Sequence, residues 1–419
     1  MTNDTRPILY GVADYAEIRR ANAWFVDRTA KIRDLEATRY ALFLRPRRFG
    51  KSLLVSMLQY YYDVAFAGRF DELFGGTEIG AAPTDERGKY FVLKFDFSAV
   101  SKVPHRVEDD FNSYALLCCD AFARDYGARL PAGLADRILK AENIGLKLNE
   151  IILGLRSCDV KLYVMVDEYD NFTNTILAES GLAAYNDLCH GDGFFKQFFT
   201  ILKTATGGTN APVARLFITG VSPVTMDDVT SGFNIGTNIS LDPQFADFTG
   251  FRHDDLRAIA DYYAPRCCFD ADRACDAALA WYDNCRFGSA SAPAMANTTL
   301  VLSFFDKLVR TRIWPSDMID ENLRTDYAKI RHLIEKSNRV DKVVSCLKEI
   351  VLKRRISAPL ITHCQKIDDE WSLTSWLYHV GLLSISGNDY GNFAFEIPNK
   401  HAEVCLADLM SSMEANRKL

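Results

Sequence analysis

The stretch from Tyr40 to Asp63, YALFLRPRRFGKSLLVSMLQYYYD, constrains the fold of this chain more than any other. It opens with an apolar run, passes through a short turn rich in arginine, and continues with apolar residues at helical spacing. A continuous apolar run is typical of a strand covered on both faces, as in a parallel sheet. The sequence therefore predicts a strand over 40–44, a tight turn, and a helix over 52–62.

The turn ends in Gly50-Lys51-Ser52, the last part of the pattern that closes a phosphate-binding loop between a strand and a helix. Gly50 lets the backbone approach phosphates, Lys51 reaches the outer phosphates, and the Ser52 hydroxyl is suited to Mg²⁺. The predicted nucleotide-binding residues are Arg45, Pro46, Arg47, Arg48, Phe49, Gly50, Lys51, Ser52 and Leu53.

Arg45 stands where such loops usually begin with glycine, so free access to a positive φ is lost there. Pro46 fixes its own φ and biases Arg45 towards an extended backbone, which predicts a stiffer path to Gly50. Arg45, Arg47 and Arg48 have several open roles. They are candidates for stabilising a transferring phosphate or for reaching the nucleotide of a neighbouring subunit. The alternative is that they are solvated or paired with acidic side chains.

A second motif lies downstream in LYVMVDEYD, where a buried strand is expected to end in Asp167 and Glu168. In a phosphate-loop site we expect Asp167 to hold Mg²⁺ and Glu168 to orient the attacking water, which makes Glu168 and Lys51 the predicted catalytic residues. The alternative is that both acids only end a strand in solvent.

A third motif is RLFITGVS, whose Thr219 and Ser222 are candidates for contacting the γ-phosphate or the water. Thr219 is the one that we predict to be catalytic. The alternative is that they cap a strand or form a turn with Gly220.

The order of predicted elements indicates an α/β fold with a parallel central sheet. After about residue 245 the pattern becomes helical, and 375–399 indicates a helix end followed by a hairpin turned at GNDYGN. We expect three domains: a P-loop ATPase domain over 1–245, a helical lid over 246–335, and a winged-helix-like module over 336–419. The predicted strands are 40–44, 90–98, 161–170 and 215–222; the predicted helices are 52–62, 108–125, 134–155, 193–204, 252–283, 293–315 and 339–354.

Composition excludes some classes of protein. A net charge of −6 argues against a chain coated with basic residues for nonspecific nucleic-acid binding. The N-terminus has no signal-peptide pattern, and the chain has no apolar run long enough to span a membrane, so we expect a cytoplasmic protein. The basic stretch 352–355 is a candidate contact for a nucleic-acid backbone, although a charged helix end is the favoured explanation.

These motifs together resemble the AAA-ATPase-like family of uncharacterised prokaryotic proteins. The stretches that carry the resemblance are RPRRFGKSLL, VDEYD, FITGV, FVDRTAKIRDL, SGFNIGTNISLDPQFADFTGF, WYDNCRF, LYHVGLLSI and IPNK. The resemblance implies an additional-strand P-loop ATPase in which Arg at the start of the loop is a family trait. It assigns Lys51 and Ser52 to phosphate and Mg²⁺, and Asp167 and Glu168 to metal and water.

The resemblance also marks Asp27, Asp170 and Trp281 as motif positions whose role the residues do not explain. WYDNC departs from the family's usual Trp-Tyr-Asp-Gly-Tyr. Family members commonly carry a PD-(D/E)XK nuclease-like domain, which needs Glu or Gln two positions before Lys. No such spacing occurs in this sequence, so we expect the ATPase part alone.

We therefore expect an Mg²⁺-dependent ATPase that acts as a nucleotide-driven switch, linked to nucleic-acid or defence processes. Its expected partners are ATP, nucleic acid bound through the C-terminal module, and either a second copy of the chain or an effector protein; no membrane is expected. The alternative is a nucleotide-responsive DNA-binding or regulatory protein with little turnover that acts through a partner nuclease.

Overall fold

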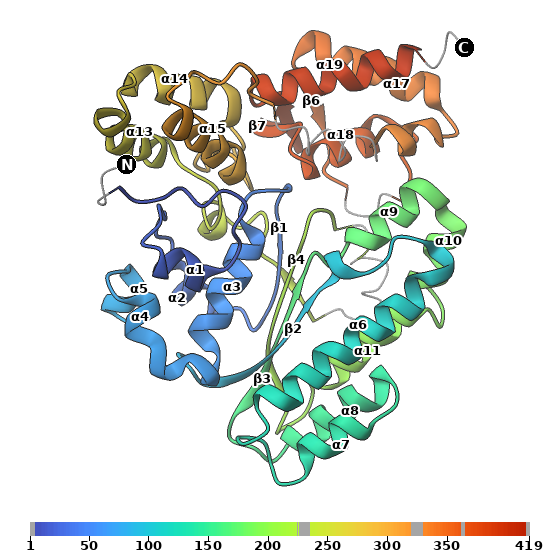
Figure 1. Cartoon of the computed structure of the whole chain (residues 1–419). Coiled ribbons are helices and arrows are strands. Elements are labelled where there is room, and N and C mark those ends of the chain that lie inside the picture. The colour runs from blue at the N-terminus through green and yellow to red at the C-terminus, as the bar shows by residue number, and fades with distance from the viewer. Residues whose placement is uncertain (1–4, 224, 226–234, 320–329, 362–364, 416–419) are drawn as a thin grey trace. The chain divides into compact units, whose positions relative to one another are not determined.

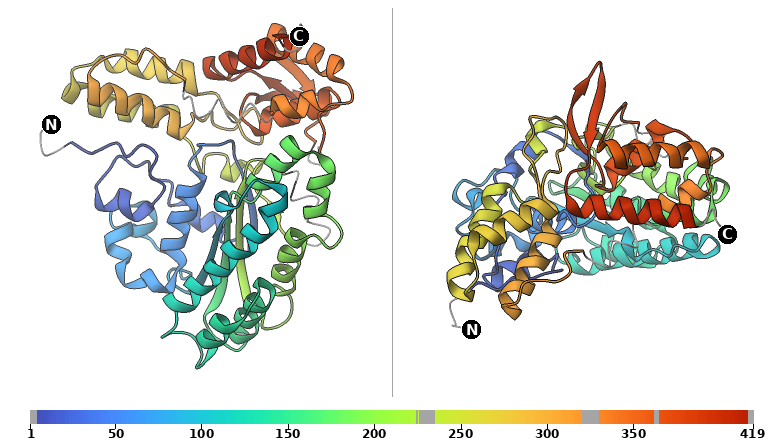
Figure 2. Two further views of the ribbon diagram at one scale, coloured as in Figure 1. Left: turned by 45° about the vertical axis from the view of Figure 1, so that its right-hand side comes forward. Right: turned by 90° about the horizontal axis from the view of Figure 1, so that it is seen from above.

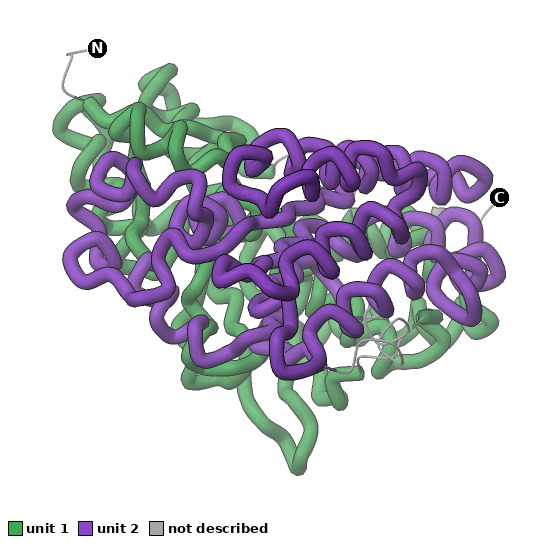
Figure 3. Tube along the Cα trace, turned by 90° about the horizontal axis from the view of Figure 1, so that it is seen from below, with its two compact units in different colours: residues 1–28, 45–54, 240–419 green, residues 29–44, 55–239 purple. Residues whose placement is uncertain are grey.

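The structure is a computed structural model that describes residues 5–223, 225, 235–319, 330–361 and 365–415. It contains two compact units, each built from segments that are distant in sequence (Figure 3). Unit 1 comprises 1–28, 45–54 and 240–419, and unit 2 comprises 29–44 and 55–239. Part of the resembling stretch 231–251 lies outside the described residues. The three-domain division remains a prediction.

Unit 2 is built around a sheet with the strand order β2–β3–β4–β1–β5 (Figure 1). Every neighbouring pair in it is parallel, and the longer strands are almost wholly buried. The predicted α/β fold with a parallel central sheet is thus confirmed, although β2, β3 and β4 each end two or three residues earlier than expected. The strands are β1 (Tyr40–Leu44), β2 (Tyr90–Asp96), β3 (Lys161–Asp167), β4 (Val213–Gly220) and β5 (Thr237–Asn238).

Helices of unit 2 pack on this sheet, and one predicted helix differs from the structure. The helix expected over 134–155 is two helices, because Asn143 caps the second one by accepting a hydrogen bond from the Leu146 amide at 2.9 Å. The described helices are α2 (Lys31–Leu35), α4 (Phe70–Phe74), α5 (Glu78–Ala81), α6 (Pro104–Asp125), α7 (Leu134–Lys140), α8 (Ile144–Leu155), α9 (Asn171–Ser180), α10 (Leu182–Cys189) and α11 (Phe194–Thr204). Helix α3 (Lys51–Tyr62) has its first residues in unit 1 and the rest in unit 2.

Unit 1 contains α1 (Tyr15–Arg20) and a helical cluster of α13 (His253–Cys267), α14 (Ala271–Tyr282) and α15 (Thr298–Thr311) around a shared apolar core. The helix expected over 252–283 is therefore two helices. Cys268 ends the first in a left-handed conformation, and Asp270 caps the second by accepting from the Arg273 amide at 3.0 Å. The helix expected over 293–315 is shorter because Asn297 caps it at its start.

The rest of unit 1 is a helix-and-sheet segment, with α17 (Val340–Lys353), α18 (Glu370–His379) and α19 (Lys400–Ala415). Its antiparallel sheet has the order β6–β8–β7, formed by β6 (Arg355–Ala358), β7 (Ser384–Asp389) and β8 (Asn392–Glu396). The hairpin predicted at GNDYGN is confirmed, and Figure 2 shows it as a red ribbon. Within the described parts of the chain, no helix combines the length and the apolar character that crossing a bilayer requires.

Candidate functional site

The candidate phosphate loop lies in unit 1 and follows β1 directly in the chain. Gly50 has a φ of +89°, which glycine adopts without steric cost, and α3 begins at the next residue. Lys51 is only 3% exposed, and its Nζ donates to the Pro46 carbonyl at 3.2 Å. The loop thus brings the Pro46 carbonyl back to the ammonium group at the start of a helix, and the N-terminus of a helix favours bound phosphate.

Arg45 is buried, and its guanidinium faces backbone oxygens of unit 1. It donates to the carbonyls of Ser240 and Phe245, each at 2.8 Å, and its Cζ lies 4.1 Å from the centre of the Phe287 ring. Burial lowers the pKa of Arg45 to about 9, so the group still carries its charge at neutral pH. Arg45 therefore fastens the beginning of the loop to the segment 240–245. Arg47 and Arg48 are half-buried, and their roles remain predictions.

The acidic pair lies in unit 2 at the end of β3. Asp167 is 2% exposed, so it does not simply end a strand in solvent. Its Oδ1 accepts a hydrogen bond from the Glu168 amide at 3.0 Å, and Glu168 adopts a φ of +52°. A non-glycine residue in this left-handed region costs of order 1 kcal/mol, and such strained residues are concentrated at functional sites.

Asp170, which the sequence analysis left without a role, joins the loop after β3 to the turn after β4. It is 1% exposed and accepts hydrogen bonds from the amides of Val221, at 3.1 Å, and Ser222, at 2.8 Å, and from the side-chain amide of Asn174 at 2.7 Å. Tyr169 reinforces this junction by donating its hydroxyl to the Ser222 carbonyl. Asp170 thus holds two of the predicted motifs together.

Thr219 and Ser222 are both almost fully buried in unit 2. The Thr219 hydroxyl donates to the Phe43 carbonyl at 2.8 Å and so links β4 to β1. This bond favours a structural role for the hydroxyl, while its predicted contact with the γ-phosphate remains a prediction.

Gly220 closes β4 where there is no room for a side chain. A Cβ there would lie 2.4 Å from Oδ1 of Asp170 and 2.5 Å from Cδ1 of Tyr169. We expect Gly220→Ala to lower the free energy of unfolding by about 1–3 kcal/mol, because overpacking must displace the buried Asp170 junction.

Urea denaturation of Gly220→Ala against Gly68→Ala measures this effect. Gly68 lies in a short 3₁₀ helix (Val64–Arg69), where an added Cβ meets nothing within 4 Å. Equal stability of the two variants would show that the junction yields without cost.

The topology of unit 2 brings the carboxyl ends of the three motif strands to one edge of the sheet. Leu44 of β1 pairs with Gly220 of β4, and Val166 of β3 pairs with Ile218 of β4. Strand β4 therefore separates the strand that precedes the loop from the strand that ends in Asp167.

The residues proposed for magnesium offer the ligands that this ion prefers. Ser52 supplies a hydroxyl oxygen and Asp167 a buried carboxylate. Among the described residues, no group of three or more His, Cys, Asp or Glu side chains could hold a metal. Mg²⁺ commonly takes one or two protein ligands and completes its shell with water and substrate phosphates, so a hydroxyl such as that of Ser52 or a carboxylate such as that of Asp167 suits a nucleotide-borne magnesium.

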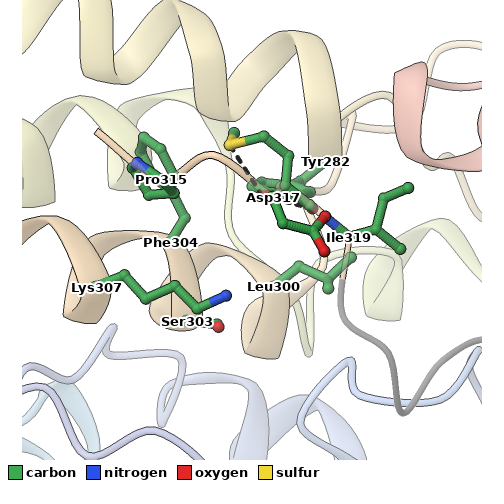
Figure 4. A pocket seen from close by; sticks show the side chains of 9 residues that line it. Tyr282, Leu300, Ser303, Phe304, Lys307, Pro315, Asp317 and Ile319 are labelled. Atoms are coloured by element: carbon green, nitrogen blue, oxygen red, sulfur yellow. Dashed lines mark hydrogen bonds between the residues drawn. The ribbon is translucent and has the colours of Figure 1, made fainter. Parts of the chain in front are cut away.

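A small pocket in unit 1 lies elsewhere, between α14, α15 and the segment 315–319 (Figure 4). Tyr282, Phe304, Lys307 and Asp317 are among its lining residues. None of the predicted site residues lines it, so it is not the candidate nucleotide site.

Comparisons with known proteins agree with this fold. The sequence profile of a family described as "Predicted AAA-ATPase" matches residues 9–230. No curated protein matches the sequence. A Walker-type ATPase of Pyrococcus abyssi superposes with a TM-score of 0.53 and 12% identity, covering 97% of this chain and 100% of its own, which shows a shared fold. The ORC1 protein of Aeropyrum pernix, solved in complex with DNA, gives a TM-score of 0.33 at 11% identity, over 99% of this chain and 100% of its own, which is too low to show a shared fold.

Proposed function

We propose that this chain, which belongs to the family of predicted AAA-ATPases, binds Mg²⁺-ATP and hydrolyses it. The observation that carries the proposal is the strand order β2–β3–β4–β1–β5. It puts one additional strand between the strand that leads into the Gly50-Lys51 loop and the strand that ends in Asp167. That is the arrangement expected of an additional-strand P-loop ATPase.

The proposed roles follow from the chemistry of the residues. Loop amides and Lys51 would hold the phosphates, and Ser52 and Asp167 are each proposed as a ligand of the metal. A magnesium ion held by these residues would offset the negative charge of the phosphates. Glu168 accepts a hydrogen bond from the attacking water and orients it, and Thr219 remains the candidate beside the γ-phosphate.

The C-terminal segment supports a second part of the proposal, a winged-helix-like module. Helix α17, the strand order β6–β8–β7 and the β7–β8 hairpin follow the arrangement of winged-helix domains. However, α18 is buried without interruption from Ser372 to Tyr378. The turn after it also packs on the phosphate loop, because a Cβ on Gly381 would lie 3.0 Å from Cβ of Pro46. This burial favours a module that acts within the chain over one that inserts α18 into DNA.

One assay tests the ATPase proposal and the DNA-binding alternative. We expect purified full-length protein to release phosphate from ATP with Mg²⁺ and to stop when EDTA removes the metal. A second experiment measures binding of the protein to duplex DNA at low salt, with and without ATP. A salt-dependent DNA complex whose affinity changes with ATP, with negligible turnover, would replace the ATPase proposal by the alternative. No ATP binding and no turnover under any condition would refute both.

We propose that nucleotide turnover drives a switch, and the contacts between the phosphate loop and the rest of unit 1 support this. A link to nucleic-acid or defence processes, an effector protein and self-association remain predictions.

A further inference from the structure

The outer side of the phosphate loop is held by the first residues of α15, within unit 1. Three successive loop carbonyls each accept a hydrogen bond from this helix start. Asn297 Nδ2 donates to the Arg47 carbonyl at 3.0 Å. The Thr299 amide donates to the Arg48 carbonyl at 3.1 Å, and the Thr298 hydroxyl donates to the Phe49 carbonyl at 3.2 Å. We call Asn297, Thr298 and Thr299 the loop clamp.

Asn297 connects the clamp to the helical cluster α13–α15. Its Oδ1 caps α15 by accepting a hydrogen bond from the Leu300 amide at 3.2 Å. Its backbone N–H donates at 3.2 Å to the carbonyl of Tyr282, which is the last residue of α14. Asn297 is 8% exposed, so these bonds are shielded from water. One buried residue thus ties the start of α15 to the phosphate loop through its side chain, and to the end of α14 through its backbone amide.

The chemistry of the loop explains why its carbonyls need such partners. A peptide group can aim its N–H at a phosphate only if the carbonyl on its other side points away from the anion. Donors outside the loop fix that orientation before the nucleotide arrives. They also hold Arg48, whose φ of +68° is unfavourable for a residue with a side chain.

We propose that the loop clamp positions the phosphate loop and thereby makes ATP affinity depend on the helical cluster α13–α15. The clamp residues are positioning residues, because they contact the loop backbone. This inference rests on the proposed function, since it concerns the same nucleotide site. The cluster then supplies a route by which nucleotide binding and the conformation of unit 1 influence each other.

Asn297→Ser tests the clamp. Serine keeps a neutral N-cap for α15 but is too short to replace the amide donor to Arg47. We expect KM for ATP to rise about tenfold, as the loss of one buried hydrogen bond predicts, while kcat at saturating ATP changes less than twofold. Asn143→Ser is the matched control, because Asn143 caps α8 in unit 2 and donates nothing to the loop.

A second pair of variants keeps the test decisive if Asn297→Ser fails to fold. Thr298→Val removes the hydroxyl that reaches the Phe49 carbonyl at nearly constant volume, and Thr298→Ser restores it. We expect a severalfold rise in KM for Thr298→Val and recovery for Thr298→Ser.

The outcomes separate this inference from the proposed function. If the wild type hydrolyses ATP while Asn297→Ser and Thr298→Val keep its KM, the clamp is overturned and the ATPase proposal stands. If Asn297→Ser does not fold, an unchanged KM in Thr298→Val alone overturns the clamp. A wild type that neither binds nor hydrolyses ATP removes the proposed function itself.

Discussion

Lys51→Ala is expected to abolish ATP turnover and to weaken binding of Mg²⁺-ATP by roughly 10- to 100-fold, the range for a lost charge-assisted hydrogen bond. Lys51 is almost fully buried inside the candidate loop and carries the only side-chain charge that the GKS motif contributes to the phosphates. Alanine also leaves the Pro46 carbonyl without the Nζ donor that it has now. Both losses fall on the nucleotide site.

Isothermal titration with Mg²⁺-ATP, followed by a phosphate-release assay, measures this effect. Lys89→Ala is the matched control, because Lys89 is an exposed lysine of unit 2 that precedes β2. The control is expected to bind and hydrolyse ATP as the wild type does. A Lys51→Ala protein with wild-type turnover would show that the loop is not the phosphate site.

Glu168→Gln is expected to keep ATP binding while lowering turnover by about 10²–10⁴-fold, the usual contribution of a general base. Gln has nearly the same size and tolerates the left-handed backbone about as well as Glu, so the fold at the end of β3 should persist. What it loses is the ability of the carboxylate to accept a proton from water. Binding and chemistry are therefore expected to separate in this variant.

Phosphate release at saturating Mg²⁺-ATP, with the amount of bound nucleotide measured alongside, checks this separation. The matched control is Glu179→Gln, an exposed residue near the end of α9. A large loss of nucleotide binding in Glu168→Gln would instead assign Glu168 a role in holding the ligand or the fold.

Elements with a strong local pattern could be predicted from the sequence. The strand at 40–44, the turn to Gly50 and the buried strand that ends in Asp167 are where the apolar runs and the GKS motif indicated. The two helix breaks that were missed also had local signals. Asn143 and Asp270 are good N-cap residues, and weighing them against the helical pattern would have divided 134–155 and 252–283.

The partners of Arg45, Asp170 and Asn297 could not be predicted, and the reason is the same for all three. Arg45 and Asn297 donate to backbone carbonyls, and Asp170 accepts from backbone amides. In each case the partner lies in a segment that is distant in the sequence. Every residue has a carbonyl, and all but proline have an amide, so such partners leave no mark in the sequence. The motifs marked Arg45 and Asp170 but not Asn297, and only the fold shows what the three side chains contact.

The most direct test of the central claim is the identity of the nucleotide that each protein retains. Wild type and Glu168→Gln are incubated with Mg²⁺-ATP, separated from free nucleotide, quenched in acid, and analysed for ATP and ADP. Hydrolysis with Glu168 orienting the attacking water predicts ADP on the wild type and intact ATP on Glu168→Gln. ADP on both proteins in equal amounts, or no nucleotide on either, would contradict it.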